Sequence, residues 1–321
     1  MEIISTFEQN ISQEEKVKIL REVKKLSTLN SYKSVFAILS DWLIIAATII
    51  IAVSISNILL TIISIFIIGS RQHALLLLMH EAAHYRLTNN KNINQFLSDF
   101  FCAFPLFVTT NKYRDSHLAH HKYLNTEKDP DWMLKKGLEE WEFPKQKREV
   151  LLLYVKHLFG LKSFDFLKKI YRFGAKNKSV TTESDVSKYY KLLRVFYYAI
   201  LYTIITLSHS WKIYLLYWIV PAFTVLPFLL RLRGIAEHFG LSWKHELNNA
   251  RNVTANVFEQ FFLVQHNANY HLDHHLFPSV PFYNLKKLHA ILEQNRFYVE
   301  NASNTSSYLL NDSVFNEITQ E

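Results

Sequence analysis

Eight of the 15 histidines in this 321-residue chain gather in three short motifs. The motifs are His80-Glu-Ala-Ala-His84, His117-Leu-Ala-His120-His121 and His271-Leu-Asp-His274-His275. On a helix, residues three and four apart share one face, so each motif directs two or three imidazoles toward one place. A tetrahedral zinc site uses four ligands, or three and a water. Eight imidazoles exceed that number and predict two metal ions held side by side.

A ninth histidine belongs with these eight. His238 directly follows a long apolar stretch, at the place where the chain is expected to leave the membrane. Its neighbour Glu237 is a candidate hydrogen-bond partner for an imidazole. Other acids near the motifs could also orient imidazoles by accepting their free N–H protons. These acids are Glu81, Asp115, Asp131 and Asp273.

The elements that must position the motifs are membrane helices. Residues 42–69 are almost wholly apolar and exceed the roughly 20 residues that one bilayer crossing needs. The run extends on both sides, so we expect two helices that turn near residues 54–57. A second apolar block, residues 192–230, is interrupted at residues 208–212 and predicts another hairpin. Residues 96–108 are too short to cross and contain Pro105, which favours a re-entrant or interfacial segment. The expected fold is all-α and integral to the membrane, with four transmembrane helices in two hairpins and a helical cap that carries the histidine motifs.

This topology places all three motifs on one side of the bilayer, because an even number of crossings separates them. That side is rich in lysine and arginine, for example at residues 145–148. The positive-inside rule makes it cytoplasmic, together with both termini. The net charge of +8 suits contact with anionic membrane lipid, and nucleic-acid binding is not needed to explain it. His209 falls on the opposite side and cannot be a ligand.

Three segments follow from composition. Residues 1–34 are a charged amphipathic segment expected at the membrane interface, and residues 35–300 form the membrane domain. Residues 301–321 are polar and have the composition of a disordered tail. Cys102 is the single cysteine, which excludes a cysteine-ligated iron–sulfur cluster, and six glycines leave no dinucleotide-binding GxGxxG motif. Electrons for a redox reaction would therefore come from a separate protein.

With these residues assembled, the chain resembles the membrane fatty acid desaturase and hydroxylase superfamily. The similarity covers about residues 73–289 and includes Arg71-Gln-His before the first motif, Asp129-Pro-Asp131 after the second and His275-Leu-Phe-Pro-Ser-Val-Pro in the third. The resemblance implies a di-iron centre that uses O2 to desaturate a fatty acyl chain in lipid metabolism. It also implies an external electron donor, a ferredoxin or a cytochrome b5. The implied iron ligands are His80, His84, His117, His120, His121, His238, His271, His274 and His275.

Three alternatives remain open at this point. The same ligands could serve a hydroxylase or ketolase that acts on a lipid or another apolar substrate. His80-Glu81-Ala-Ala-His84 also satisfies HExxH, the motif of zinc proteases, although that interpretation leaves the second and third motifs unexplained. A non-catalytic metal-binding membrane protein would need neither a substrate tunnel nor a redox partner. We assign surface roles to His157, His209, His245 and His289, and we leave His73 and His266 outside the ligand set.

Overall fold

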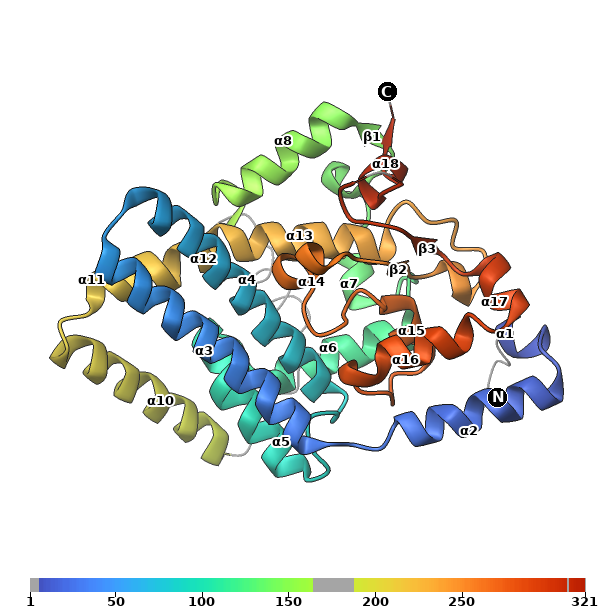
Figure 1. Cartoon of the computed structure of the whole chain (residues 1–321), viewed down its shortest axis with the longest axis horizontal. Coiled ribbons are helices and arrows are strands. Elements are labelled where there is room, and N and C mark those ends of the chain that lie inside the picture. Colours follow the sequence, from blue (N-terminus) through green and yellow to red (C-terminus); the bar gives the residue numbers. More distant parts are fainter. Residues whose placement is uncertain (1–5, 164–187, 311, 321) are drawn as a thin grey trace.

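A computed structural model describes residues 6–163, 188–310 and 312–320. The elements are mainly helices (Figure 1). The described residues also contain four strands of two residues each. The longer helices are α2 (Gln13–Leu26), α3 (Ser31–Ile55), α4 (Ile58–Ala83), α6 (Thr110–Tyr123), α8 (Lys147–Leu158), α10 (Lys188–Leu207), α13 (Val225–His238) and α16 (Phe282–Leu292). The shorter helices are α1 (Thr6–Gln9), α5 (Lys91–Ser98), α7 (Pro130–Met133), α11 (Trp211–Tyr214), α12 (Val220–Phe223), α14 (Val257–Phe262), α15 (His271–Leu276), α17 (Arg296–Asn301) and α18 (Val314–Glu317).

Among the described residues, four apolar helices are long enough to cross a membrane: residues 31–55, 58–83, 190–207 and 211–238. The prediction of a largely helical membrane protein with two hairpins is confirmed. The protein itself buries only 28% of the residues in the most apolar 18-residue stretch of the first of these helices. In the third helix the corresponding share is 6%. Apolar side chains that the protein leaves uncovered in this way need a lipid environment.

The turn between α3 and α4 consists of Ser56 and Asn57, within the region where the sequence pattern predicts it. Ser56 ends α3 with φ +52°, the left-handed conformation common after helix C-termini. Asn57 then caps α4, because its side chain accepts hydrogen bonds from the backbone N–H groups of Leu59 and Leu60. This tight connection sets α3 and α4 side by side (Figure 1).

The fourth apolar helix runs further than the sequence predicts. We expected it to end near residue 230, but it continues through α11, a π-helical turn (Leu215–Ile219), α12 and α13 to His238. His238 therefore lies in the last helical turn. Similarly, the first histidine motif does not follow α4 but forms its final turn, with His84 as the C-cap.

The short segment between α5 and α6 forms a π-helical turn (Asp99–Ala103) and a 3-10 turn (Phe104–Leu106). Two tryptophans fix it to the membrane helices. The indole of Trp42 donates to the Phe101 carbonyl, and the indole of Trp218 donates to the Pro105 carbonyl, each at 2.9 Å. Its placement within the bilayer stays a prediction.

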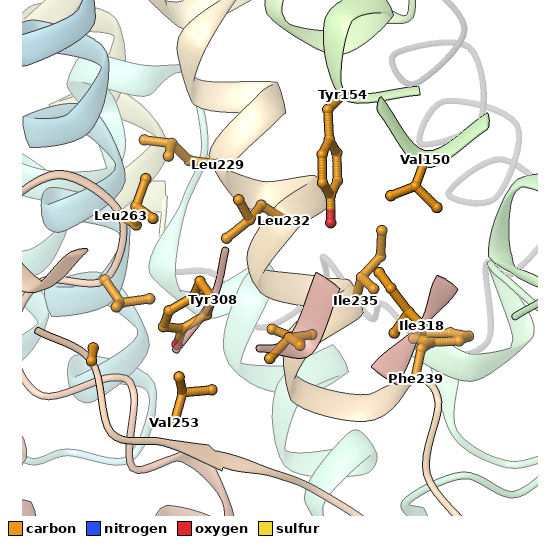
Figure 2. Packing of buried hydrophobic residues seen from close by; sticks show 14 of the residues in the cluster. Val150, Tyr154, Leu229, Leu232, Ile235, Phe239, Val253, Leu263, Tyr308 and Ile318 are labelled. Atoms are coloured by element: carbon orange, nitrogen blue, oxygen red, sulfur yellow. The ribbon is translucent and has the colours of Figure 1, made fainter. Parts of the chain in front are cut away.

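The described residues of the C-terminal tail, 301–310 and 312–320, are folded, which differs from the disorder that composition suggests for residues 301–321. Strand β4 (Thr319–Gln320) pairs in parallel with β1 (Lys145–Gln146), and β3 (Asn304–Thr305) pairs with β2 (Asn252–Val253). Tyr308, Val314 and Ile318 are buried in a cluster that also contains residues of α8 and α13. Figure 2 shows Tyr308 and Ile318 in this cluster. Three well-spaced apolar side chains hold the tail, although its average composition is polar. The segment boundaries predicted at residues 34 and 300 stay predictions.

Candidate metal centre

The nine predicted histidines converge from four helices and form two groups. His80, His84, His117, His121 and His274 make a five-histidine group, and His120, His238, His271 and His275 make a four-histidine group. In each group, one nitrogen per imidazole lies within 4.8 Å of the corresponding nitrogens of the others. Helices α4, α6, α13 and α15 supply them.

The second and third motifs each divide their histidines between the two groups. His117 and His121 join the five-histidine group, whereas His120 joins the other. The third motif does the reverse, because His271 and His275 join the four-histidine group and His274 joins the five-histidine group. On a helix, residues i and i+4 point about 40° apart, whereas i+3 and i+4 point about 100° apart. The HxxHH spacing therefore serves two neighbouring sites from one helix.

The spacing of the nitrogens fits metal ions. The Nε2 atoms of His84 and His117 are 2.9 Å apart, and those of His117 and His121 are 3.1 Å apart. In the four-histidine group, the Nε2 atom of His271 lies 2.9 Å from that of His238 and 3.0 Å from that of His275. Two imidazole nitrogens bound at right angles to one ion at about 2.1 Å would be roughly 3 Å apart.

Unpaired nitrogens support the same conclusion. Nε2 of His80 and both ring nitrogens of His274 are buried without a hydrogen-bond partner in the described part of the chain. A buried polar atom without a partner is unfavourable, and a bound metal ion would remove that cost. The donor set is entirely imidazole, which suits iron, copper and zinc.

Burial favours the neutral form of several imidazoles in these groups. Burial and the charges of Arg86 and Arg114 lower the pKa of His84 from its ordinary 6.5 to about 4. Burial and neighbouring imidazoles hold the pKa values of His117, His274 and His275 well below that value. Metal binding requires a neutral imidazole, so these groups need release no proton at pH 7.

Polar contacts at Nδ1 orient three imidazoles of the four-histidine group. Nδ1 of His120 lies 3.0 Å from both carboxylate oxygens of Asp129. Nδ1 of His271 lies 3.1 Å from the Glu237 carboxylate. Nδ1 of His238 lies 3.1 Å from the Asn249 carbonyl oxygen. With the proton held at Nδ1 by these acceptors, Nε2 of each ring is free for a metal.

Most of the acids that could have oriented imidazoles have other partners or none at the motifs in the described residues. Glu237 orients His271 and not its neighbour His238, because adjacent residues on a helix point in different directions. Asp131 pairs with Lys135, and Asp273 accepts hydrogen bonds from Asn252, Tyr298 and His289. In the described residues, neither acid bonds to a motif imidazole, and no such bond is formed by Asp115. Glu81 comes no closer than 3.5 Å to Nδ1 of His80.

Sequence reasoning missed Asp129 and Asn249 as hydrogen-bond partners. Asp129 belongs to the Asp-Pro-Asp sequence that was noted after the second motif. Which of its two acids contacts an imidazole depends on helix geometry. Asp129 is the N-cap of α7 and is buried, which directs it toward His120. Asn249 acts through its backbone carbonyl, so no side-chain pattern could reveal it.

The histidines left out of the ligand set lie outside both groups. His73 bonds to Gln265, and His266 bonds to Asp41. His209 lies in the turn between α10 and α11, at the far end of that hairpin from the metal centre. The expected surface role of His289 is wrong, because it is buried against Asp273. His157 is also buried.

Long apolar helices that end in two buried imidazole groups define a membrane-bound metalloprotein. Residues 56–302 match the profile of the family described as fatty acid desaturase. The chain is also 32% identical over 307 residues to dihydrorhizobitoxine desaturase from Bradyrhizobium elkanii. This match covers 91% of this chain and 85% of the relative. The chain therefore belongs to the fatty acid desaturase family, whose members are oxidoreductases. This membership sets aside the zinc-protease interpretation of the first motif.

Proposed function

We propose that this protein is an O2-dependent di-iron desaturase, with a fatty acyl chain as its substrate. The convergence of nine imidazoles into groups of five and four supports the proposal most strongly. The five-histidine group would hold one iron and the four-histidine group the other. When bound, the iron pair would supply O2 activation. In the overall reaction, two hydrogen atoms leave adjacent carbons, and one O2 is reduced to two waters by these hydrogens together with two external electrons and two protons.

The chain's own residues prepare the site for this reaction. Asp129, Glu237 and the Asn249 carbonyl fix the orientation of three imidazoles before metal binds. Rings that are held in place lose little freedom when the metal binds. The buried surroundings also exclude bulk water, which protects a reactive oxidant from side reactions.

The electrons require a donor outside this chain, for which a ferredoxin or a cytochrome b5 is proposed. Its approach would be from the cytoplasm if the positive-inside orientation holds. A relative that is called a desaturase of dihydrorhizobitoxine supports double-bond formation over hydroxylation as the outcome.

Metal analysis of detergent-purified protein, combined with lipid profiling of expressing and non-expressing cells, tests the proposal. We expect about two irons per chain and new double bonds in lipid from expressing cells. The His120→Ala protein should lose iron and activity. Two irons with hydroxylated or keto products would replace the proposed reaction, and one zinc with unchanged lipids would refute the di-iron centre.

A further inference from the structure

Helix α8 has apolar side chains on two opposite faces. On one face, Val150 and Tyr154 are buried in the same cluster as Leu229 and Leu232 of α13 (Figure 2). The other face and the two residues that continue it are apolar but exposed: Leu151, Leu152, Val155, Phe159 and Leu161. A helix at a water-exposed surface usually pairs one apolar face with a polar one. The second apolar face of α8 therefore needs a cover of its own.

Helix α14 exposes apolar side chains in the same way. Val257 is 84% exposed and Phe258 is 65% exposed, and Phe261 beside them is partly exposed. The buried residue of this short helix is Glu259, which accepts hydrogen bonds from the C-terminal tail. The side of α14 that faces away from the protein is thus its apolar side, the reverse of what contact with water favours.

The C-terminal end of α8 is anchored deep along the fourth apolar helix, where α8 lies beside α13 (Figure 1). The Ser163 hydroxyl donates to the Phe223 carbonyl at 2.6 Å, and Gly160 packs so closely that a Cβ atom there would lie 2.8 Å from the same oxygen. Phe223 is 12 residues after Trp211, the first residue beyond the hairpin turn. This distance is roughly 18 Å along a helix, whereas the hydrocarbon core of a bilayer is about 30 Å thick.

Helix α14 is anchored at the same depth on α4. The Ser70 hydroxyl donates to the Phe261 carbonyl at 3.2 Å, and the rings of Phe66 and Phe262 are 5.9 Å apart. Ser70 is 12 residues after Ile58, the first residue of α4, which again gives roughly 18 Å from the hairpin turn. The close approach of Gly69 to Val225 shows that α4 and α13 are level here. Both anchors therefore lie within the thickness of the hydrocarbon core.

The charges around α8 are distributed as such a depth requires. Lys147 and Arg148 are at its N-terminal end, away from the deep anchor. Lys162 follows the deep end, but its ammonium lies 3.6 Å from the Glu140 carboxylate, and the Glu140 carbonyl accepts a hydrogen bond from Arg231. Arg231 is 20 residues after Trp211, roughly 30 Å away, at the boundary of the core. Lys162 thus extends back toward that boundary, as lysines near a membrane surface do.

We propose that α8 and α14 insert their exposed apolar side chains into the leaflet on the side of the metal centre, where lipid acyl chains cover them. The protein would then enter this leaflet through two short elements in addition to its four spanning helices. A soluble partner would have to reach roughly 12 Å below the boundary of the core to cover the same side chains. The proposal concerns the membrane contact alone and does not depend on the desaturase function.

Spin labels on α8 test this proposal in nanodiscs of phosphatidylcholine and phosphatidylglycerol. Phe159→Cys carries the label at the deep end, and Arg148→Cys is the matched control. These positions are 11 residues apart, about three helical turns, so they share one face at different depths. Paramagnetic resonance then measures collisions of each label with O2, which concentrates among acyl chains, and with a water-soluble nickel complex. At position 159 we expect roughly tenfold fewer nickel collisions than at position 148, together with more O2 collisions.

Phe258→Cys should give the same result as Phe159→Cys, and Val155→Cys provides a second site on α8 if the change at position 159 lowers the melting temperature. Nickel collisions as frequent at positions 159 and 258 as at position 148 would place both helices in water and overturn the proposal. Protection from both reagents would indicate a protein cover, such as a second copy of this chain, and would overturn it as well. Protection at only one helix would contradict joint insertion.

Discussion

Asp129 and Asp131 flank Pro130, and their different contacts allow a matched test of imidazole orientation. Asp129 is 1% exposed and bonds to Nδ1 of His120, whereas Asp131 pairs with Lys135. We expect Asp129→Asn to lower metal affinity at the four-histidine group by roughly 10- to 100-fold, because His120 loses a charged acceptor. Metal titration of apo-protein measures this.

Asp131→Asn should bind metal nearly as well as the unsubstituted protein. Equal losses in the two variants would show that local negative charge, and not the orientation of His120, controls metal affinity.

His289 predicts a pH-dependent contribution to stability. Burial disfavours the charged imidazole, but the hydrogen bond and charge of Asp273 outweigh burial and raise the pKa of His289 above 6.5. A folded-state pKa above the unfolded value stabilises the protein below pH 6.5, and this stabilisation is lost as pH rises through the raised pKa.

His289→Gln should therefore lower the free energy of unfolding by about 1–2 kcal/mol at pH 6 and by less at pH 9. Thermal unfolding in detergent across this range measures the difference. Glu293→Gln is the control, because Glu293 is 55% exposed and its contact with His289 is 3.4 Å. A difference that stays constant with pH would contradict the charged pair.

At the scale of single residues, sequence spacing predicted the eight motif histidines, and position after an apolar helix added His238, but only one of the orienting acids was among the candidates. Helical spacing fixes which side chains share a face, and this was enough for the motifs. The partner of each imidazole depends on how different helices pack, as Glu237 shows by reaching His271 and not His238. The division into groups of five and four depends on the same packing.

Among the helices, the close contact of α4 and α13 depends on Gly69. A Cβ atom at this position would lie 2.5 Å from Cβ of Val225, which cannot move without its backbone. Gly69→Ala should therefore separate the two helices and cost about 1–3 kcal/mol in stability. It should also lower iron content, because α4 and α13 carry His80 and His238.

Gly234→Ala is the matched helical control, since its Cβ would lie 3.4 Å from the nearest atom, on Trp141. The melting temperature and the bound iron, measured in both variants, should fall in Gly69→Ala and change little in Gly234→Ala. Unchanged values in Gly69→Ala would mean that the two helices do not need this close approach.

The tail shows why composition misled the prediction for this element. An average over residues 301–321 is polar, but Tyr308, Val314 and Ile318 are all buried in one hydrophobic core. Figure 2 shows Tyr308 and Ile318 there. The buried carboxylate of Glu259 also accepts hydrogen bonds from the Ser307 hydroxyl and the Tyr308 backbone N–H. Glu259 lies about 50 residues earlier, so no local pattern could indicate this contact.

Deletion of residues 304–321 should lower stability by several kcal/mol, at roughly 1.5–3 kcal/mol for each buried apolar side chain lost. Metal should be lost as well, because Arg251 would lose Glu317 while it holds the Ala236 carbonyl, two residues before His238. Thermal unfolding and metal analysis measure both effects. Leu310→Ser, which changes an exposed tail residue, should have little effect on either.

For the whole molecule, the orientation in the membrane is a prediction from the distribution of basic residues. The single native cysteine, Cys102, is buried, so it should not react with external reagents. Ser208→Cys should be labelled by a membrane-impermeant maleimide in intact cells, whereas Ser306→Cys should be labelled only after lysis. The opposite result would place the metal centre outside the cytoplasm.

Both histidine groups combine residues from distant parts of the chain. The five-histidine group needs His274 to join four histidines that precede it by more than 150 residues, and the four-histidine group needs His120 to join three that follow it. During synthesis, neither group can be completed before the third motif has left the ribosome. A metal ion that needs either complete group could therefore bind only after most of the chain has been made, and a chain that terminates before His271 would enter the membrane without either complete group.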